Sequence, residues 1–179
     1  MVIAFWGEVR HSSTTTHLRV LADVLSAMCP ETKIVIGHVE KDQNAICLLD
    51  CGTDLTARKL RLLFRADMII VSLKQEHACI RRFFEENLYM MQMRMKKEML
   101  ILLGGYECEP GVNPFYLNRV YRADLDRISV IPYNNAYYYA AKKGEGRAFI
   151  ERELENGTVE NEQFMNELQK IARRMIRRK

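Results

Sequence analysis

The sequence lacks the features that mark several large classes of protein. None of its apolar runs approaches the ~20 residues that a membrane-spanning helix needs. Charge of neither sign dominates, because 27 Lys and Arg stand against 23 Asp and Glu, and a net charge of +4 is too small by itself to indicate nucleic-acid binding. The opening MVIAFWGEVR has neither the basic leader nor the cleavage site of a signal peptide, so a cytoplasmic location is expected.

Cysteine and histidine are too few and too scattered for a disulfide framework or a metal cluster. The five cysteines are odd in number, and the four histidines form no HxxxH pair. Cys47 and Cys51 are close in sequence, but they lie in the apolar segment AICLLDCG, where a free cysteine acts as a small apolar residue. We therefore predict a buried strand there and no metal site.

What is present is an alternation of short apolar runs and amphipathic helical stretches in one domain of 179 residues. Several runs are apolar throughout, which is typical of strands buried on both faces in a parallel sheet. We predict an α/β fold with a single doubly wound, mostly parallel sheet sandwiched by helices. Strands are expected at 2–6, 33–39, 45–50, 67–73, 98–103 and 128–131. Helices are expected at 14–28, 55–65, 75–91, 113–121, 134–143, 146–156 and 161–178.

The segment after the first strand, GEVRHSSTTT at residues 7–16, has the layout of a phosphate-binding loop. Such loops need glycines whose N–H groups wrap the phosphates, a lysine for the phosphate oxygens and a Ser or Thr for Mg²⁺. Here one glycine is present and no lysine. Two interpretations stay open: a plain strand–loop–helix with a hydroxyl-rich cap, or a vestigial cradle for phosphate. The hydroxyl residues of that cradle are Ser12, Ser13, Thr14, Thr15 and Thr16.

A single acid, Asp50, follows the apolar run ICLL at the end of a predicted strand. In nucleotide hydrolases an aspartate at this place holds Mg²⁺. Asp50 could equally cap the turn that follows it. A Mg²⁺ site is therefore expected only if a nucleotide binds.

Taken in order, these segments resemble the ParA/MinD superfamily of deviant Walker ATPases, whose fold is of the P-loop NTPase type. VIAFWGEVRHSSTTTHLRVLADVL is similar to its first strand, loop and helix, and AICLLDCG to its Walker B strand. RADMIIVSLKQE and MLILLGGY resemble the next two strands, and ISVIPYNNAYYYAAKKGEGRAF the closing segment. The resemblance implies a site for ATP or ADP with Mg²⁺, with Pro132 and Tyr133 beside the adenine. More narrowly, the chain is similar to small clostridial ParA-like proteins and to TadZ, the atypical ParA-like component of Tad/Flp pilus assembly.

The sequence departs from that family in two ways that bear on activity. Both Walker lysines are missing, and Arg10 differs from lysine in reach and geometry. The predicted strands ending near 39 and beginning at 45 leave no room for the switch segment that carries the water-activating aspartate. We therefore expect negligible ATP hydrolysis, with weak nucleotide or anion binding at the helix N-terminus as what remains.

The last predicted helix, within residues 160–179, is amphipathic and basic at its end. An apolar stripe is expected to pack, and three uses of the cations stay open: a charged helix end, a membrane-surface helix at the inner face of the membrane, or contact with nucleic acid, the least favoured. The cations are Lys170, Arg173, Arg174, Arg177 and Arg178.

Two other groups of residues are expected to be structural. Arg58, Lys59, Arg61 and Arg65 fall on one predicted helix and are interpreted as a solvated face. The run of tyrosines at 137–139 is expected in the core, with a partner surface as the alternative.

These observations favour a non-catalytic, degenerate ParA/MinD-like protein that works in assembly or localisation through protein partners, as in a Tad/Flp-type pilus or secretion system. Any homodimer is expected to be independent of nucleotide. One alternative is a nucleotide-binding switch with weak ATPase activity. The other is a peripheral membrane or nonspecific DNA-binding module that uses the basic tail.

Overall fold

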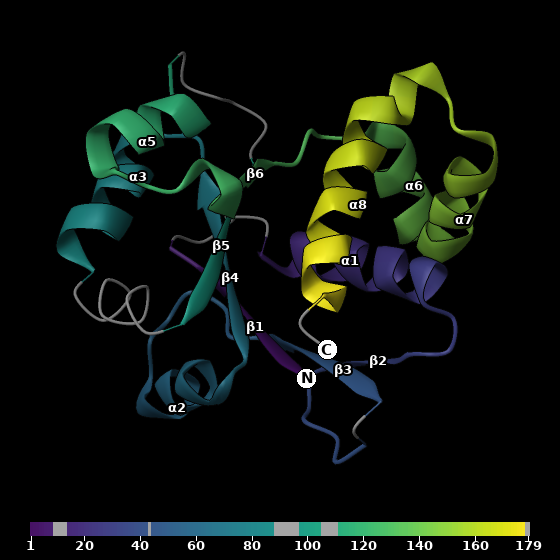
Figure 1. Ribbon diagram of the computed structural model, residues 1–179, viewed down its shortest axis with the longest axis horizontal. Helices are drawn as coiled ribbons and strands as arrows, with labels where there is room; N and C mark the ends of the chain where they lie inside the picture. Colours follow the sequence, from purple (N-terminus) through teal and green to yellow (C-terminus); the bar gives the residue numbers. More distant parts are fainter. Residues whose placement is uncertain (9–13, 43, 88–96, 105–110, 178–179) are drawn as a thin grey trace.

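A six-stranded parallel sheet lies at the centre of the computed structural model, which describes residues 1–8, 14–42, 44–87, 97–104 and 111–177 (Figure 1). The strand order is β2-β3-β1-β4-β5-β6, and every neighbouring pair is parallel. Because the order runs outward in both directions from β1, the predicted doubly wound sheet is confirmed. The strands are β1 (Val2–Gly7), β2 (Lys33–Ile36), β3 (Ala45–Asp50), β4 (Met68–Lys74), β5 (Glu98–Gly104) and β6 (Ile128–Val130).

Helices cover both faces of this sheet. One layer consists of α1 (Thr14–Met28), α6 (Asn135–Lys142), α7 (Gly146–Asn156) and α8 (Glu162–Ile176). The other consists of α2 (Ala57–Arg65), α3 (His77–Arg81), the π-helical turn η1 (Arg82–Glu86) and α5 (Pro114–Tyr121). Two 3₁₀ turns, η2 (Leu125–Arg127) and η3 (Val159–Asn161), precede β6 and α8.

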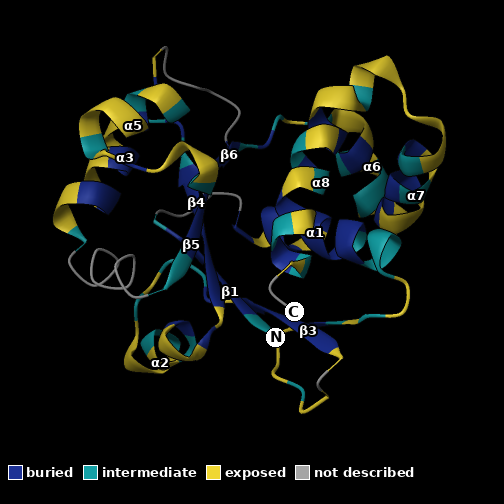
Figure 2. Ribbon diagram, viewed as in Figure 1, coloured by how far each residue is buried: buried dark blue, intermediate teal, exposed yellow. Residues whose placement is uncertain are grey.

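The strand β1 shows why the sequence of the sheet is apolar throughout. Ile3 and Phe5 belong to the core under α1, whereas Ala4 and Trp6 belong to the core under α2, α3 and α5. Successive side chains of a strand point to opposite faces, and here both faces are covered. The inner strands β1, β3, β4 and β5 are accordingly buried almost along their whole length, whereas the edge strand β2 has only Val35 buried (Figure 2).

Two predicted helix boundaries are corrected by local geometry. The helix predicted at 75–91 is α3 followed by the π-helical η1, which ends at Glu86, and residues 88–91 lie outside the described part. The second helix begins at Ala57 rather than at residue 55. Its N-cap is Thr56, whose hydroxyl accepts from the Lys59 N–H. Residues 52–54 lie upstream of this cap.

The connection from β2 to β3 is unusually short for two parallel neighbours. The second strand, predicted to reach residue 39, ends at Ile36 because Gly37 turns the chain with φ = +92°. Parallel neighbours are usually joined by a dozen or more residues that include a helix. Here the described residues between 37 and 44 form no helix, and the Glu40 N–H donates to Cys47 Sγ over 3.2 Å. The connection between β2 and β3 is thus shorter than such a crossover usually is.

Candidate functional site

In a doubly wound sheet the ligand site lies at the carboxyl ends of the strands, next to the strand at which the order reverses. In this chain that edge carries Asp50 at the end of β3 and Gly104 at the end of β5. The first residues of α1 and the residues after β6 lie at the same edge, because both come after the carboxyl end of a strand. The candidate site is built from these four segments.

Thr15 and Asp50, both proposed from the sequence, are in direct contact. The Thr15 hydroxyl donates to one carboxylate oxygen of Asp50 over 2.7 Å. The other oxygen accepts from the Gly52 N–H over 2.8 Å, and the carbonyl of Gly52 accepts from the Gly7 N–H over 3.0 Å. Asp50 therefore caps the turn after β3 and also ties that turn to α1. Capping of the turn by Asp50 is compatible with a role of the same carboxylate near Mg²⁺.

The other residues of the hydroxyl cradle fall in different places. Thr14 is buried in the first turn of α1, and Thr16 is exposed. Ser12 and Ser13 lie outside the described residues. Thr15 and Asp50 supply oxygen ligands of the kind that Mg²⁺ prefers, and Mg²⁺ usually keeps several of its waters. Because both Asp50 oxygens already accept hydrogen bonds, the pair fits Mg²⁺ held through water.

Charged residues follow or end the neighbouring strands β1 and β4. Glu8 follows β1 and is half-buried, and burial raises the pKa of its carboxyl, although Asn87 donates to that carboxylate over 3.3 Å. Lys74 at the end of β4 is paired with Glu76 over 3.4 Å. A cation reaches the turn after β3 from α2, since a Cβ at Gly52 would lie 3.2 Å from Lys59 Nζ. Sequence reasoning missed this contact.

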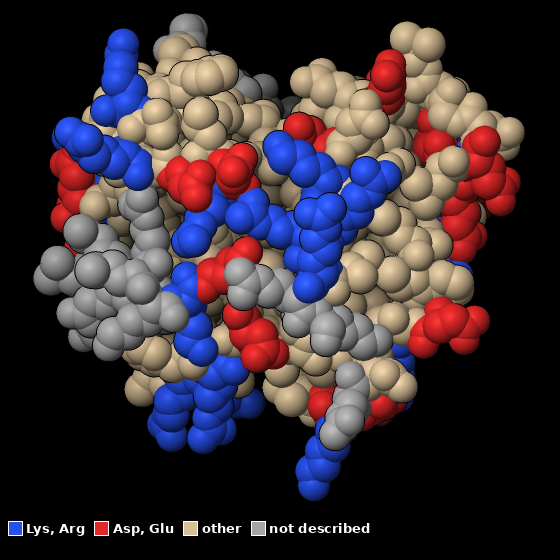
Figure 3. All heavy atoms as spheres, viewed as in Figure 1, with Lys and Arg blue, Asp and Glu red and all other residues tan. Residues whose placement is uncertain are grey.

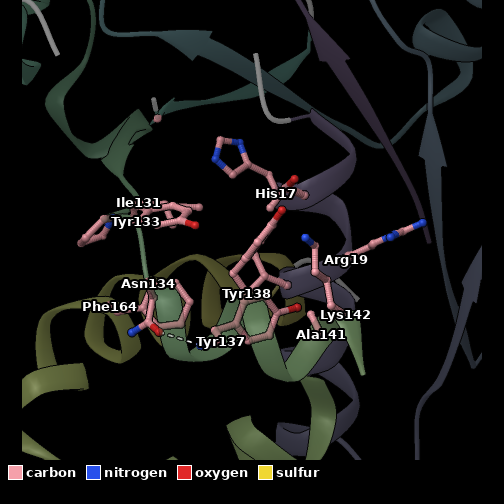
Figure 4. A pocket seen from close by; sticks show the side chains of 14 residues that line it. His17, Arg19, Ile131, Tyr133, Asn134, Tyr137, Tyr138, Ala141, Lys142 and Phe164 are labelled. Atoms are coloured by element: carbon pink, nitrogen blue, oxygen red, sulfur yellow. Dashed lines mark hydrogen bonds between the residues drawn. The ribbon is translucent and has the colours of Figure 1, made fainter. Parts of the chain in front are cut away.

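A pocket of about 190 Å³ opens beside the N-terminal half of α1 (Figure 4). Pro132 and Tyr133, the two residues proposed to lie beside an adenine, both line it. Figure 4 shows His17, Tyr133 and Tyr138 directed toward the pocket from three different segments, whereas Arg19 points away. The remaining lining residues are Thr16, Val20, Gly104, Ile131, Asn134, Tyr137, Ala141, Lys142 and Phe164.

His17 forms a buried polar wall of this pocket. Its ring is 4% exposed, and Nδ1 lies 2.9 Å from the Ser72 hydroxyl of β4. Burial lowers the pKa of His17 from 6.5 to about 4, so the imidazole is neutral near pH 7. Gly104 makes room for it, because a Cβ there would lie 2.8 Å from His17 Nε2.

The aromatic wall of the pocket comes from the first turns of α6. Asn134 is the N-cap of that helix, and its side chain accepts from the Tyr137 N–H over 2.8 Å. The rings of Tyr133 and Tyr138 lie with their centroids 6.1 Å apart, and Lys142 Nζ lies 4.5 Å from the centre of the Tyr138 ring.

Sequence reasoning missed His17, Tyr138 and Lys142 as parts of the site. The signal for His17 was its position four residues before Leu21, on the buried stripe of α1. The three tyrosines separate: Tyr137 is buried and donates to Asp23 over 2.8 Å, Tyr138 is half-buried, and Tyr139 is 62% exposed.

The basic tail divides into anchored and outward-facing cations. The predicted stripe of α8 is buried in the core, and it consists of Phe164, Leu168, Ile171 and Met175. Arg174 lies 3.3 Å from the Glu98 carboxylate and also donates to the Asp126 carbonyl, so it docks the helix. Lys170, Arg173 and Arg177 are exposed, and Arg178 lies outside the described residues. A membrane-surface helix would need the apolar stripe that the fold already buries.

Within the described residues, no helix combines the length and the apolar character needed to cross a bilayer. The same part of the chain holds no group of three or more His, Cys, Asp or Glu side chains arranged for a metal ion.

The arrangement has chemical consequences for a ligand. An aromatic pocket with a neutral imidazole suits a planar ring with a polar edge. The Thr15–Asp50 pair lies at the start of the same helix, where backbone N–H groups favour an anion. The parallel sheet, the strand–loop–helix at its centre and this edge site define a protein with the fold of P-loop NTPases.

Comparison with solved structures shows which proteins of this fold the chain is similar to. The structure matches a plasmid partition protein from Borrelia burgdorferi bound to AMPPNP, with a TM-score of 0.65, 10% identity, and coverage of 99% of each chain. It matches the cell division ATPase MinD from Pyrococcus furiosus with a TM-score of 0.67, 12% identity and 98% of each chain.

A ParA family ATPase from Chlorobium tepidum gives a TM-score of 0.66 at 9% identity, over 96% of this chain and 98% of that one. No protein-family model matches the sequence, and no curated protein matches it. The chain therefore has the ParA/MinD fold, and its own site residues must supply the argument for function.

Proposed function

We propose that this protein is a non-catalytic, degenerate member of the ParA/MinD type that acts as an assembly or localisation factor through protein–protein contacts. A Tad/Flp-type pilus or secretion system is the setting that the resemblance to TadZ implies. One observation carries the proposal: the site keeps the Thr15–Asp50 hydrogen bond, yet residues 7–16 contain no lysine and a single glycine.

The missing groups are those that phosphoryl transfer depends on. Catalysis of this reaction is almost entirely positioning and electrostatic stabilisation of charge on the transferred phosphoryl group. Here the residue after β1 is a half-buried acid, Glu8, and the cation that reaches the turn after β3, Lys59, comes from another helix. The short connection between β2 and β3 leaves no switch segment to position a water. Hydrolysis should therefore be negligible.

A nucleotide-binding switch with weak activity is the second candidate, because of the pocket. Pro132, Tyr133 and Tyr138 form an aromatic wall close to the start of α1, and Thr15 with Asp50 would hold Mg²⁺ through water. ATP or ADP would bind with its base in the pocket, and Mg²⁺ would supply charge neutralisation at the phosphates. A homodimer, if formed, would not need this nucleotide, since no lysine is present to reach across to a partner site.

Phosphate release and thermal unfolding with Mg-ATP and Mg-ADP separate the two candidates. We expect the wild-type protein to release phosphate no faster than its Asp50→Asn variant. Turnover that Asp50→Asn abolishes would contradict the main proposal. A nucleotide that binds the folded protein, present at 100 times its Kd, adds ~2.7 kcal/mol to the free energy of unfolding. For a chain of this size that is a rise in Tm of roughly 5–10 °C.

Neighbouring tyrosines provide a matched control for the pocket. Tyr138 lines the pocket, whereas Tyr139 is exposed on the same helix outside it. If a nucleotide binds, Tyr138→Ala should remove the thermal shift and Tyr139→Ala should keep it. Equal loss in both variants would place the ligand elsewhere.

A further inference from the structure

The helix α2 presents a basic surface together with an exposed aromatic ring. We call Arg58, Arg61, Phe64 and Arg65 the α2 surface; its three arginines are exposed and Phe64 is 47% exposed. The arginines stand at i, i+3 and i+7, so adjacent like charges repel one another, which costs roughly 0.2–0.5 kcal/mol per pair. No arginine of this surface forms an ion pair with a carboxylate of the described residues. The helix is therefore left with positive charge that an acidic partner would compensate.

The outward cations of α8 differ in this respect. Lys170 lies 3.6 Å from the Glu167 carboxylate, and Arg173 donates to the Gln169 side chain over 3.0 Å. Their charge or hydrogen-bonding capacity is partly satisfied within their own helix. On α2, Arg61 likewise donates to the Ala57 carbonyl of its own helix over 3.3 Å. Within the described residues, however, none of the three arginines of α2 has a carboxylate partner, whereas Lys170 of α8 has one.

The opposite kind of surface lies where α7 turns into α8. We call Glu155, Val159, Glu160 and Glu162 the acidic turn; all four are exposed, and Val159 is 88% exposed. The cation beside it, Arg152, lies 3.9 Å from the Glu153 carboxylate and 5.3 Å from the centre of the Phe149 ring. The acidic turn thus combines an exposed apolar side chain with carboxylates. The α2 surface combines an exposed apolar ring with guanidinium groups.

The two surfaces lie far apart on the molecule. Figure 1 places α2 and the α7–α8 turn at opposite corners, on opposite faces of the sheet. In Figure 3, Lys and Arg gather over α2 at the lower left, and Asp and Glu gather over α7 and its turn at the right. They cannot meet within one chain. They can meet between two chains in a head-to-tail contact, which leaves one surface of each kind free for the next copy.

We propose that the α2 surface binds the acidic turn of a second copy of this chain, so that copies join head to tail without nucleotide. The inference rests on the proposed role in assembly and adds the contact through which copies associate. Phe64 would contact Val159, and the arginines would contact the glutamates. With one helix face and one turn on each side, the contact falls at the small end of specific interfaces, so association is weak and depends on concentration.

Salt and concentration provide the first test, by sedimentation velocity of the nucleotide-free protein. Association should increase with protein concentration at about 0.01 M salt, where the Debye length is about 30 Å, and disappear near 1 M, where it is about 3 Å. A protein that stays monomeric at low salt and high concentration would overturn the proposal. Because nucleotide is absent, this result is independent of whether the ATP site is degenerate.

Charge reversal provides the second test. Arg58→Glu with Arg61→Glu should weaken association about tenfold or more, and so should Glu155→Lys with Glu160→Lys. Mixing the two variants should restore association, because each variant keeps one intact surface and the reversed surfaces complement each other. Failure of the mixture to associate would contradict this pairing of surfaces.

The matched control is Lys170→Glu with Arg173→Glu, which makes the same change of charge on α8. This variant should associate as the wild type does. An equal loss would show an effect of net charge only and would overturn the proposal. A duplex DNA probe and an acidic poly-glutamate peptide complete the experiment: binding of either that Arg58→Glu with Arg61→Glu abolishes, while self-association is unchanged, would assign the α2 surface to that other partner.

Discussion

At the scale of single residues, His17 is the side chain on which the pocket and the stability of the fold both depend. It is buried and neutral, and Ser72 fixes one of its ring nitrogens. A buried imidazole without a charge partner resists protonation, since the charged form would lose its hydration. The pocket therefore has a polar wall whose state changes only in acid.

This burial gives a pH dependence of stability. The pKa of His17 is about 4 in the folded protein and 6.5 in the unfolded chain, so the unfolded chain binds more protons between these values. The free energy of unfolding should fall by roughly 3 kcal/mol as pH decreases from 6.5 to 4. Urea unfolding at a series of pH values measures it.

The control for this prediction is His17→Asn. Burial raises the pKa of Glu8 and of Asp23, and raised carboxyl pKa values act in the opposite direction, because the folded protein then holds the extra protons. Both proteins share these groups, so the difference between their pH profiles isolates His17. If the unfolding free energies of the wild type and His17→Asn changed with pH in the same way, His17 would not be the group responsible.

Gly104 is the second residue whose identity the pocket fixes. In Gly104→Ala the new Cβ would lie 2.8 Å from His17 Nε2 and 2.9 Å from Cε1. Overpacking of this kind typically costs about 1–3 kcal/mol of unfolding free energy. Chemical denaturation should show that loss in the wild-type background and a smaller one in His17→Ala. A loss of the same size in both backgrounds would exclude the contact as its cause.

Sequence reasoning reached part of this site. Thr15 and Asp50 could be proposed because residues after strand ends in a parallel sheet gather at one edge. His17 could not be proposed from its residue type alone, because a histidine on a helix indicates a site only when its neighbours are known. Those neighbours, Ser72 and Gly104, lie 55 and 87 residues further along the chain.

At the scale of elements, the periodic pattern of α8 predicts which of its faces is buried, and tertiary contacts decide which of its cations anchors it. The 3–4 spacing of its apolar residues predicts one buried face, and the structure buries that face. The pattern could not distinguish Arg174 from the other cations. Only the packing of α8 against β5 and η2 makes Arg174 an anchor, through Glu98 and the Asp126 carbonyl.

Arg174→Ala should therefore destabilise the fold, whereas Arg173→Ala should not. The Glu98 side chain is 8% exposed and would lose an ionic partner, so a loss of about 1–3 kcal/mol is expected. Arg173 is exposed, and its removal should change stability by at most about 0.5 kcal/mol. Thermal unfolding of the two variants compares them directly. Equal Tm values would show that Arg174 does not anchor the helix.

At the scale of the whole molecule, α8 belongs to the domain and is not a detachable tail. Four large side chains of its stripe lie in the same core as α1, α6 and α7. At about 1.5–3 kcal/mol for each buried side chain, they contribute an amount comparable to the whole stability of a domain, ~5–15 kcal/mol.

A chain that ends before Glu162 should consequently not fold cooperatively. Near-ultraviolet circular dichroism should show the loss of fixed aromatic packing, and urea should give no sharp transition. A chain that ends at Arg177 retains α8 and serves as the control. A cooperative transition in the shorter chain would show that the first layer of helices is stable without α8. For the same reason, vesicle binding by the basic end should be tested with charge reversals rather than with truncation.

The sequence by itself determined the order of the elements and the parallel sheet, since these follow from local periodicity and from strands apolar on both faces. It also determined what residues 7–16 lack, because a missing lysine can be seen without coordinates. Only the tertiary structure decided which cations are anchored, where β2 and the helix of residues 75–91 end, and that His17, Tyr133 and Tyr138 meet in one pocket. These features depend on contacts between residues that are distant in the chain, and such contacts leave no periodic trace in the sequence.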